Sequence, residues 1–448
     1  MRILIAGAGT IGFNLASALA KEGQDVVVID VNERRLAALE SSVDCQIVNA
    51  SALSPLVLEE TGIRHTDLVV AVTENDAVNM SVCRLADFYG VPRKLARVRN
   101  PEFSDYDCPI PPEHFGIDHI ISPEGIAVAT IRRLIDAPGT REAADFERGR
   151  IALRALVVGD TSSIAGERLI DIHQTHGRDF LVGAIRRGSK VLIPGGQEQL
   201  RIGDTVYLVC DPDTIPKLVP LFEPHALVAK RVVIFGGGVS GVELARTLAR
   251  PLERVTLIEP DPKRAARAAG ILDELGVEVL NGSALDMELL GRCKLETVDF
   301  FVALSDSDEE NFMSALLFRK FGSGTPIVMT NQLHYMDILE SVDLDIVINP
   351  RVLAVSALMR HIRGSTVLSV AKLHSEEAEV LEFIVQKGVA VTRAELKDLQ
   401  LPRGMLIGAI LRAGELIIPR GDTRIVADDR VLVFVDARGA PHAEGLFS

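Results

Sequence analysis

Two glycine-rich segments have the spacing of loops that hold a phosphate group. The first loop is Gly7-Ala8-Gly9-Thr10-Ile11-Gly12, and the second loop is Gly236-Gly237-Gly238-Val239-Ser240-Gly241. Each follows a short apolar stretch and opens a helical pattern, which is the context in which GxGxxG binds a dinucleotide. The three glycines serve a tight turn, close backbone approach to a pyrophosphate and close helix–strand packing. The backbone N–H groups at the helix start would then face phosphate oxygens.

An acidic residue follows each loop at the same separation along the chain. Asp30 follows Gly12 in the first half, and Glu259 follows Gly241 in the second. A carboxylate at the end of the second strand accepts hydrogen bonds from ribose hydroxyls and repels a 2′-phosphate, so it favours NAD over NADP. ATP or ADP would satisfy it equally. We expect nucleotide binding at both loops, with a purely structural copy as the alternative for the second.

Four further residues are expected to line the first cleft. Thr73 and Glu74 end the fourth strand, and ligands of this fold lie beyond the carboxyl ends of the strands. Arg97 and Arg99 are two apart at the end of the fifth strand, so they share a face and are expected to reach one phosphate cluster. Surface or intersubunit ion pairs are the alternative for these arginines. The second half has Met329 and Asn331 there instead, so the two sites are not expected to bind identical ligands.

The 448-residue chain repeats itself once. The glycine loop that begins at Gly7 recurs at Gly236, Asn79 recurs as Asn311, and Gly183 recurs as Gly408. The order of the matches never changes, and the offset between matching residues drifts only slightly. This pattern indicates a tandem duplication of a unit that is half the length of the chain.

Each half divides into a nucleotide-binding fold and a smaller module. In residues 1–122 short apolar strands alternate with helices, which predicts a doubly wound parallel sheet. Strands are expected at 2–6, 25–30, 46–49, 67–72, 94–98 and 118–121, and helices at 11–21, 77–89 and 123–136. Residues 150–211 predict an antiparallel α+β module, with strands at 153–158, 180–185, 191–193 and 205–210 and a helix near 166–173. Residues 211–230 carry four prolines and are expected to link the halves.

The expected architecture is therefore α/β, with two Rossmann-like doubly wound parallel sheets, each followed by a small α+β module. The first half comprises a nucleotide-binding domain at 1–122, a connecting helix at 123–141 and a module at 142–225. The second comprises a nucleotide-binding domain at 230–350, a connecting helix at 350–365 and a module at 366–448.

Composition excludes several classes of protein. The formal net charge of −14 argues against nucleic-acid binding, which needs a basic surface. No apolar run approaches the ~20 residues of a membrane-spanning helix. The five cysteines are widely spaced and odd in number, which fits a reducing compartment without a disulfide framework. They are Cys45, Cys83, Cys108, Cys210 and Cys293.

Other chemical signals are weak. His173 and His176 lack further ligands in the same element, so we expect a solvated pair rather than a metal site. The acidic run 306–310 lacks the glycine and spacing of a calcium loop and fits a helix start. No catalytic elbow, P-loop lysine or zinc-protease motif is present. We therefore expect no catalytic residue, no metal site and no enzyme activity.

The motifs together resemble the RCK or KTN family, in the tandem form found in Trk potassium uptake systems. The motifs are the first loop with Asp30, Val70-Ala71-Val72-Thr73 followed by Asp76 and Asn79, the segment from Ala96 to Pro101, and the G-A-I, I-P and G-D motifs of the small modules. The resemblance spans essentially the whole chain. One departure is that serine, in Ala50-Ser51-Ala52 and Gly282-Ser283-Ala284, stands where the family commonly has an acid near the adenine.

The resemblance implies a regulatory subunit rather than a transporter. Such chains form tetrameric rings on the inner face of the cell membrane, beneath a potassium-translocating subunit of the TrkH or TrkG type. NAD, NADH, ATP or ADP bound in the clefts changes the ring and gates the channel. Two alternatives remain open, namely an NAD-dependent oxidoreductase with two dinucleotide domains and a regulator of a potassium efflux antiporter.

Overall fold

The computed structural model describes residues 1–103, 110–188, 190–224, 229–332, 335, 338, 342, 344, 346–362, 367–373, 378–436 and 439–447. Cys108 lies outside this part, and the four cysteines inside it are free thiols. The chain separates into two compact units. The first comprises Met1–Val128 and Asn349–Ile362, and the second comprises Ala129–Ile348 and Arg363–Ser448. No helix of the described residues is long and apolar enough to cross a membrane.

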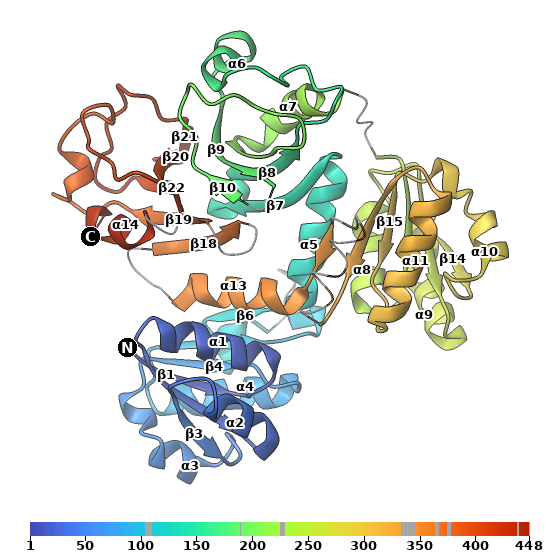
Figure 1. Ribbon diagram of the computed structural model, residues 1–448. Coiled ribbons are helices and arrows are strands. Elements are labelled where there is room, and N and C mark those ends of the chain that lie inside the picture. The colour runs from blue at the N-terminus through green and yellow to red at the C-terminus, as the bar shows by residue number, and fades with distance from the viewer. Residues whose placement is uncertain are drawn as a thin grey trace. The chain divides into compact units, whose positions relative to one another are not determined.

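The first unit contains a six-stranded parallel sheet with the strand order β3-β2-β1-β4-β5-β6 (Figure 1). The strands are β1 (Arg2–Ala6), β2 (Asp25–Asp30), β3 (Gln46–Asn49), β4 (Leu68–Ala71), β5 (Arg93–Arg97) and β6 (His119–Ile121). This is the Rossmann order, in which the strand order reverses between β1 and β4 while all strands stay parallel. Six strands were expected here, and the structure confirms all six to within a residue at each end.

Alternating residues of the central strand face two separate cores. Ile3 and Ile5 pack against α1 (Thr10–Lys21) and α2 (Glu33–Glu40). Leu4 and Ala6 pack toward α3 (Pro55–Glu60) and α4 (Asp76–Phe88). The first core also takes in α13 (Pro350–Ile362), a helix from the second half of the sequence. A parallel sheet must be covered on both faces, so the first domain uses a helix that the second half supplies.

The second nucleotide-binding fold repeats the first within the second unit. Its sheet has the parallel order β14-β13-β12-β15-β16-β17. The strands are β12 (Arg231–Phe235), β13 (Arg254–Glu259), β14 (Glu278–Asn281), β15 (Phe300–Ala303), β16 (Thr325–Met329) and β17 (Val347–Ile348). The helices described around it are α8 (Val239–Leu248), α9 (Pro262–Leu272), α10 (Met287–Arg292) and α11 (Asp308–Phe321). The internal repeat therefore corresponds to a repeated fold.

Each small module is built on a five-stranded antiparallel sheet. The antiparallel sheet was predicted, but the strand at Thr140–Phe146 in the first module was not, and it begins within residues 123–141, which were predicted as the connecting helix. The first has the order β10-β9-β11-β8-β7, with strands β7 (Thr140–Phe146), β8 (Ile151–Val157), β9 (Phe180–Arg187), β10 (Lys190–Leu192) and β11 (Thr205–Cys210) and the helix α6 (Leu169–His176). The second has the order β18-β19-β22-β20-β21, with strands β18 (Val367–Leu373), β19 (Ala378–Ile384), β20 (Met405–Arg412), β21 (Glu415–Ile417) and β22 (Arg430–Asp436), and ends in α14 (Ala440–Phe447).

The sequence expectation of a linker is wrong for part of residues 211–230. Residues Ile215–Phe222 form the helix α7, with Pro216 in its first turn and Pro220 inside it. Leu218 and Phe222 are buried in the core of the first module. Proline is tolerated in a first turn, and burial of the apolar face outweighs the cost of the internal proline.

The two antiparallel sheets pack against each other through one apolar cluster in the second unit. The cluster joins β8 and β11 of the first module to β19, β20 and β22 of the second. The fully buried ring of Phe434 lies over two glycines, Gly183 in β9 and Gly408 in β20. A Cβ atom on Gly183 would lie 2.2 Å from this ring, and one on Gly408 would lie 2.5 Å from it. The repeated glycine of the G-A-I motif therefore makes room for one aromatic ring between the modules.

Candidate nucleotide-binding sites

The first loop has the backbone geometry that its glycines predict. Gly7 has a φ of +112°, and a Cβ on it would lie 2.9 Å from the Thr73 amide nitrogen. A Cβ on Gly12 would lie 1.8 Å from the Gly7 carbonyl oxygen, inside that atom. The nearest atom to a Cβ on Gly9 is 4.0 Å away, on Arg35. The outer glycines are thus fixed by packing, while the middle one leaves the loop surface open, as approach to a phosphate requires.

The second loop repeats the geometry of the two outer glycines, whereas a Cβ on its middle glycine, Gly238, would lie 2.9 Å from an Nη atom of Arg264. Gly236 has a φ of +113°, and a Cβ on Gly241 would lie 1.8 Å from the Gly236 carbonyl oxygen. A steric constraint explains why the extra glycine stands at position 237. A Cβ on it would lie 3.0 Å from side-chain atoms of Glu259. Where the first half pairs Ala8 with the shorter Asp30, the second pairs Gly237 with the longer glutamate.

Both acidic residues lie directly against their loops. Asp30 accepts hydrogen bonds from the Ala8 amide at 2.6 Å and the Asn32 amide at 2.8 Å. Glu259 accepts from the Gly237 amide at 2.5 Å and the Asp261 amide at 2.9 Å. Both carboxylates are at most 9% exposed. Each half therefore brings together a glycine loop and an oriented carboxylate, the two groups that contact pyrophosphate and ribose in a Rossmann fold.

An arginine five positions after each acid also lies at its loop, although the motifs did not predict it. Arg35 forms an ion pair of 2.7 Å with Glu74. Arg264 lies 2.6 Å from Asp306 and 3.6 Å from Glu259, and hydrogen bonding to Asp306 raises the pKa of its guanidinium. Glu74, expected to line the cleft, thus pairs with a cation beside the loop. The only hint of these arginines in the sequence is that the spacing between acid and arginine is the same in both halves.

Thr73 is held by a fully buried asparagine, Asn79, at the start of α4. The Asn79 side-chain oxygen accepts from the Thr73 amide at 2.9 Å and from its hydroxyl at 2.7 Å. The Asn79 amide group donates to the carbonyls of Thr73 at 3.1 Å and Arg97 at 2.9 Å. Asn311 makes matching backbone bonds to Ser305 and Met329. This asparagine clamp joins the ends of two strands that border each cleft.

Replacement of Asn79 by alanine is expected to lower the free energy of unfolding of the first domain by about 2–3 kcal/mol, because each buried backbone group left unpaired costs about 1–3 kcal/mol. Chemical denaturation followed by circular dichroism measures this loss. Ser81→Ala on the same helix, at an exposed position, is the control and should change stability by at most about 0.5 kcal/mol. Equal effects of the two changes would contradict the clamp.

Arg97 and Arg99 differ in burial and in their partners. Arg97 is largely buried, lies 3.4 Å from Glu124 at the start of α5 (Pro123–Asp136), and burial lowers the pKa of its guanidinium. Its Nε atom has no hydrogen-bond partner among the described residues, so one buried donor remains for a ligand. Arg99 is more exposed and donates to the Glu74 carbonyl, while its amide donates to Asp76 at 3.0 Å.

The serines that replace the family's acid have local partners. The Ser51 hydroxyl accepts from the Leu53 amide at 3.3 Å, and the Ser283 hydroxyl accepts from the Leu285 amide at 3.1 Å. Each follows the third strand of its sheet, β3 or β14. They cap a turn at that place without adding a charge to it.

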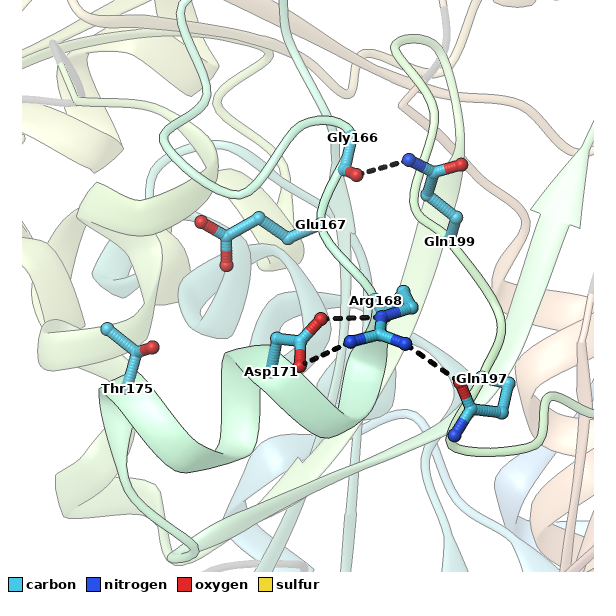
Figure 2. A pocket seen from close by; sticks show the side chains of 7 residues that line it. All are labelled: Gly166, Glu167, Arg168, Asp171, Thr175, Gln197 and Gln199. Atoms are coloured by element: carbon cyan, nitrogen blue, oxygen red, sulfur yellow. Dashed lines mark hydrogen bonds and ion pairs between the residues drawn. The ribbon is translucent and has the colours of Figure 1, made fainter.

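The first small module carries a polar pocket of about 460 Å³ (Figure 2). Its arginine, Arg168, is paired with Asp171 at 2.6 Å and with Gln197 at 3.2 Å, and Gln199 donates to the Gly166 carbonyl. Because these side chains form hydrogen bonds with one another and with the backbone, the pocket does not indicate a particular ligand. His173 contacts the Phe180 carbonyl at 3.1 Å. Across the described residues no group of three or more His, Cys, Asp or Glu side chains is placed to hold a metal.

The chain matches two family models, each of them twice. The TrkA-N domain matches residues 3–123 and 232–350, and the TrkA-C domain matches residues 153–223 and 380–448. These matches alternate along the chain in the order of the repeat.

Curated relatives match along their whole length. The Trk system potassium uptake protein TrkA of Haemophilus influenzae is 33% identical over 455 aligned residues, covering 100% of this chain and 98% of the relative. A TrkA homolog of Archaeoglobus fulgidus is 34% identical, covering 97% of each chain.

Solved structures share the fold at low identity. The GsuK channel bound to NAD superimposes with a TM-score of 0.64 at 17% identity, covering 100% of this chain and 78% of that one. The GsuK RCK domain gives a TM-score of 0.63 at 16% identity, covering 100% of this chain and 94% of that one. The fold is thus that of tandem RCK domains, and by its domains and full-length relatives the chain belongs to the TrkA family of Trk system potassium uptake proteins.

Proposed function

We propose that this chain is a cytoplasmic, non-enzymatic regulatory subunit that binds nucleotides in both Rossmann clefts and thereby gates a membrane potassium-translocating subunit of the TrkH or TrkG type. The observation that carries the proposal is the buried carboxylate held against a glycine loop, present as Asp30 in the first half and Glu259 in the second. Membership of the TrkA family supplies potassium uptake as the process.

The ligands that suit both clefts are adenine nucleotides with free ribose hydroxyls. Asp30 and Glu259 are each oriented by two backbone amides and retain lone pairs for hydroxyl donors. NAD, NADH, ATP and ADP all carry such hydroxyls, whereas a 2′-phosphate would meet a carboxylate. The GsuK channel, which shares the fold, was solved bound to NAD, and this supports NAD as the first ligand to test.

Gating requires that the nucleotide bind two states of the assembly with different affinity. A coupling of about 1–3 kcal/mol is typical of allosteric proteins. The connecting helices α5 and α13 begin beside the strands that border the clefts, and Glu124 at the start of α5 pairs with Arg97. Through these helices closure of a cleft would change the shape of a tetrameric ring.

Isothermal titration with NAD, NADH, ATP and ADP tests the binding. Asp30→Ala and Glu259→Ala should each remove one site or weaken it at least about tenfold, because hydrogen bonds to a charged group contribute about 1.5–3 kcal/mol. Glu33→Ala, which removes an exposed acid close to Asp30 in sequence, is the control and should bind as the wild type does. Absence of binding by the wild-type chain would overturn the proposal.

Rubidium uptake into vesicles that contain the potassium-translocating subunit tests the function. Nucleotide should change uptake with the wild-type chain and not with the Asp30→Ala, Glu259→Ala double variant. Co-purification tests the oxidoreductase alternative, because a regulatory subunit should be retained with the potassium-translocating subunit and a dehydrogenase should not. Nucleotide-dependent uptake that survives in the double variant would count against these clefts as the sensors.

A further inference from the structure

A side chain from the second half of the sequence reaches the first glycine loop. Arg351 lies in the first turn of α13, and its Nη1 atom donates to the Thr10 hydroxyl at 3.0 Å. Thr10 is the first residue of α1 and belongs to the GxGxxG segment. Both residues lie in the first compact unit. The first nucleotide cleft is therefore bordered by a cation 341 residues away in sequence.

The position of Arg351 is fixed by the packing of its helix. Ala354 and Leu358 of α13 are fully buried in the core that also contains Leu15 and Leu19 of α1. At the start of α13, the Asn349 side chain accepts from the backbone amides of Arg351 at 2.9 Å and Val352 at 3.2 Å. This cap sets the direction in which the first turn, and with it Arg351, leaves the domain surface.

The far end of α13 is also attached to the first domain. Arg93, at the start of β5, donates to the last carbonyls of the helix, those of His361 and Ile362, at 3.3 Å each. The His361 ring stacks on His119 of β6 with centroids 4.2 Å apart. The start of α13 therefore lies at Thr10, near the carboxyl end of β1, and its end lies at Arg93, at the amino end of β5. Helix α13 thus runs alongside α1 in the same direction.

The chemistry of this corner suits a phosphate group. Guanidinium groups bind phosphate through paired charge-assisted hydrogen bonds, which are stronger than a bond to a neutral hydroxyl such as that of Thr10. A second guanidinium, Arg35, lies at the same loop, with Nη1 4.0 Å from the position of a Cβ on Gly9. The loop is thus bordered by cations from both halves of the chain.

We propose that Arg351 is a phosphate-binding residue of the first nucleotide site. A nucleoside diphosphate bound there would add a contact between α13, from the second half of the sequence, and the Rossmann domain of the first half. This inference rests on the proposed binding of nucleotides at the first loop and names an additional residue of that site. The ligand class is an adenine nucleotide with at least two phosphates.

The arrangement is specific to the first site. In the repeat, the counterpart of Arg351 is Glu124, a residue of opposite charge that pairs with Arg97. The counterpart of Thr10 is Val239, which has no hydroxyl. The affinity of the first site should therefore depend on phosphate more strongly than that of the second.

The test titrates ADP and adenosine into the full chain carrying Glu259→Ala, so that heat reports on the first site. Arg351→Gln should weaken ADP binding about tenfold or more, the range of a charged hydrogen bond, and change adenosine binding less than twofold. Arg360→Gln removes the same charge at the other end of α13 and is the matched control, with ADP binding within twofold. Arg351→Lys keeps the charge and should recover part of the affinity.

A second readout follows the helix itself. ADP should slow hydrogen exchange of the α13 amides in the parent chain and not in Arg351→Gln, which gives a result even if that variant is less stable. Unchanged ADP affinity in Arg351→Gln would overturn the inference, as would an equal loss for ADP and adenosine, since the arginine would then act only on folding. If the parent chain bound neither ligand, the proposed nucleotide site itself would fail instead.

Discussion

Replacement of Gly12 by alanine is expected to abolish measurable nucleotide binding at the first site and to lower the melting temperature of the first domain. The added Cβ would lie 1.8 Å from the Gly7 carbonyl oxygen, and α1 would have to move away from β1 to relieve the overlap. That movement displaces the loop backbone at Gly9 from the position where a pyrophosphate binds. Because both binding geometry and packing are lost, we expect at least a hundredfold loss of affinity, or about 2.7 kcal/mol.

Isothermal titration and differential scanning calorimetry measure the two effects. Gly241→Ala, with its Cβ 1.8 Å from the Gly236 carbonyl oxygen, should remove the second site and leave the first intact. Gly270→Ala in α9 is the control, because no atom lies within 4 Å of its added Cβ. It should leave binding unchanged and stabilise its helix by about 0.5–1 kcal/mol. Nucleotide binding by Gly12→Ala at wild-type affinity would show that the loop is only a packing turn.

The parts of the fold that were predictable are those with a local signal. Strands such as β1 and β2 are short, continuous apolar runs, since both faces of a parallel sheet are buried, and their bounds follow directly from the sequence. The two glycine loops with their acids are equally local. Their positions relative to each other are set within one strand–helix–strand unit of about thirty residues, which leaves little freedom.

Features that depend on distant segments could not be predicted. The Arg351–Thr10 bond joins residues 341 apart, and the sequence around Arg351 shows only a helix start. The prolines of α7 predict a linker, whereas its apolar face stabilises a helix only when it packs against the module core. The role of Gly237 required the position of the Glu259 side chain. In each case the structure is determined by tertiary packing rather than by the conformational preference of the local sequence.

Replacement of Phe434 by alanine is expected to lower the free energy of unfolding of the paired small modules by about 3–5 kcal/mol, the cost of truncating a buried aromatic ring in a well-packed core. The ring is fully buried and fills the space that Gly183 and Gly408 leave open. Because both facing positions are glycines, they have no side chain that could fill the space left by the ring. Hydrogen exchange of β8, β11, β20 and β22 in the full chain, compared before and after the change, locates the loss.

Phe88→Ala is the matched control, because that ring is 82% exposed and its removal should cost at most about 0.5 kcal/mol. Gly183→Ala tests the same packing from the other side, since its Cβ would lie 2.2 Å from the Phe434 ring and should destabilise the modules strongly on its own. In the Phe434→Ala background the same methyl group would enter vacated space, so the double variant should be more stable than the sum of the single losses predicts. Additive losses would mean that the ring and the glycine do not share one site, and that the modules are held together elsewhere on their sheets.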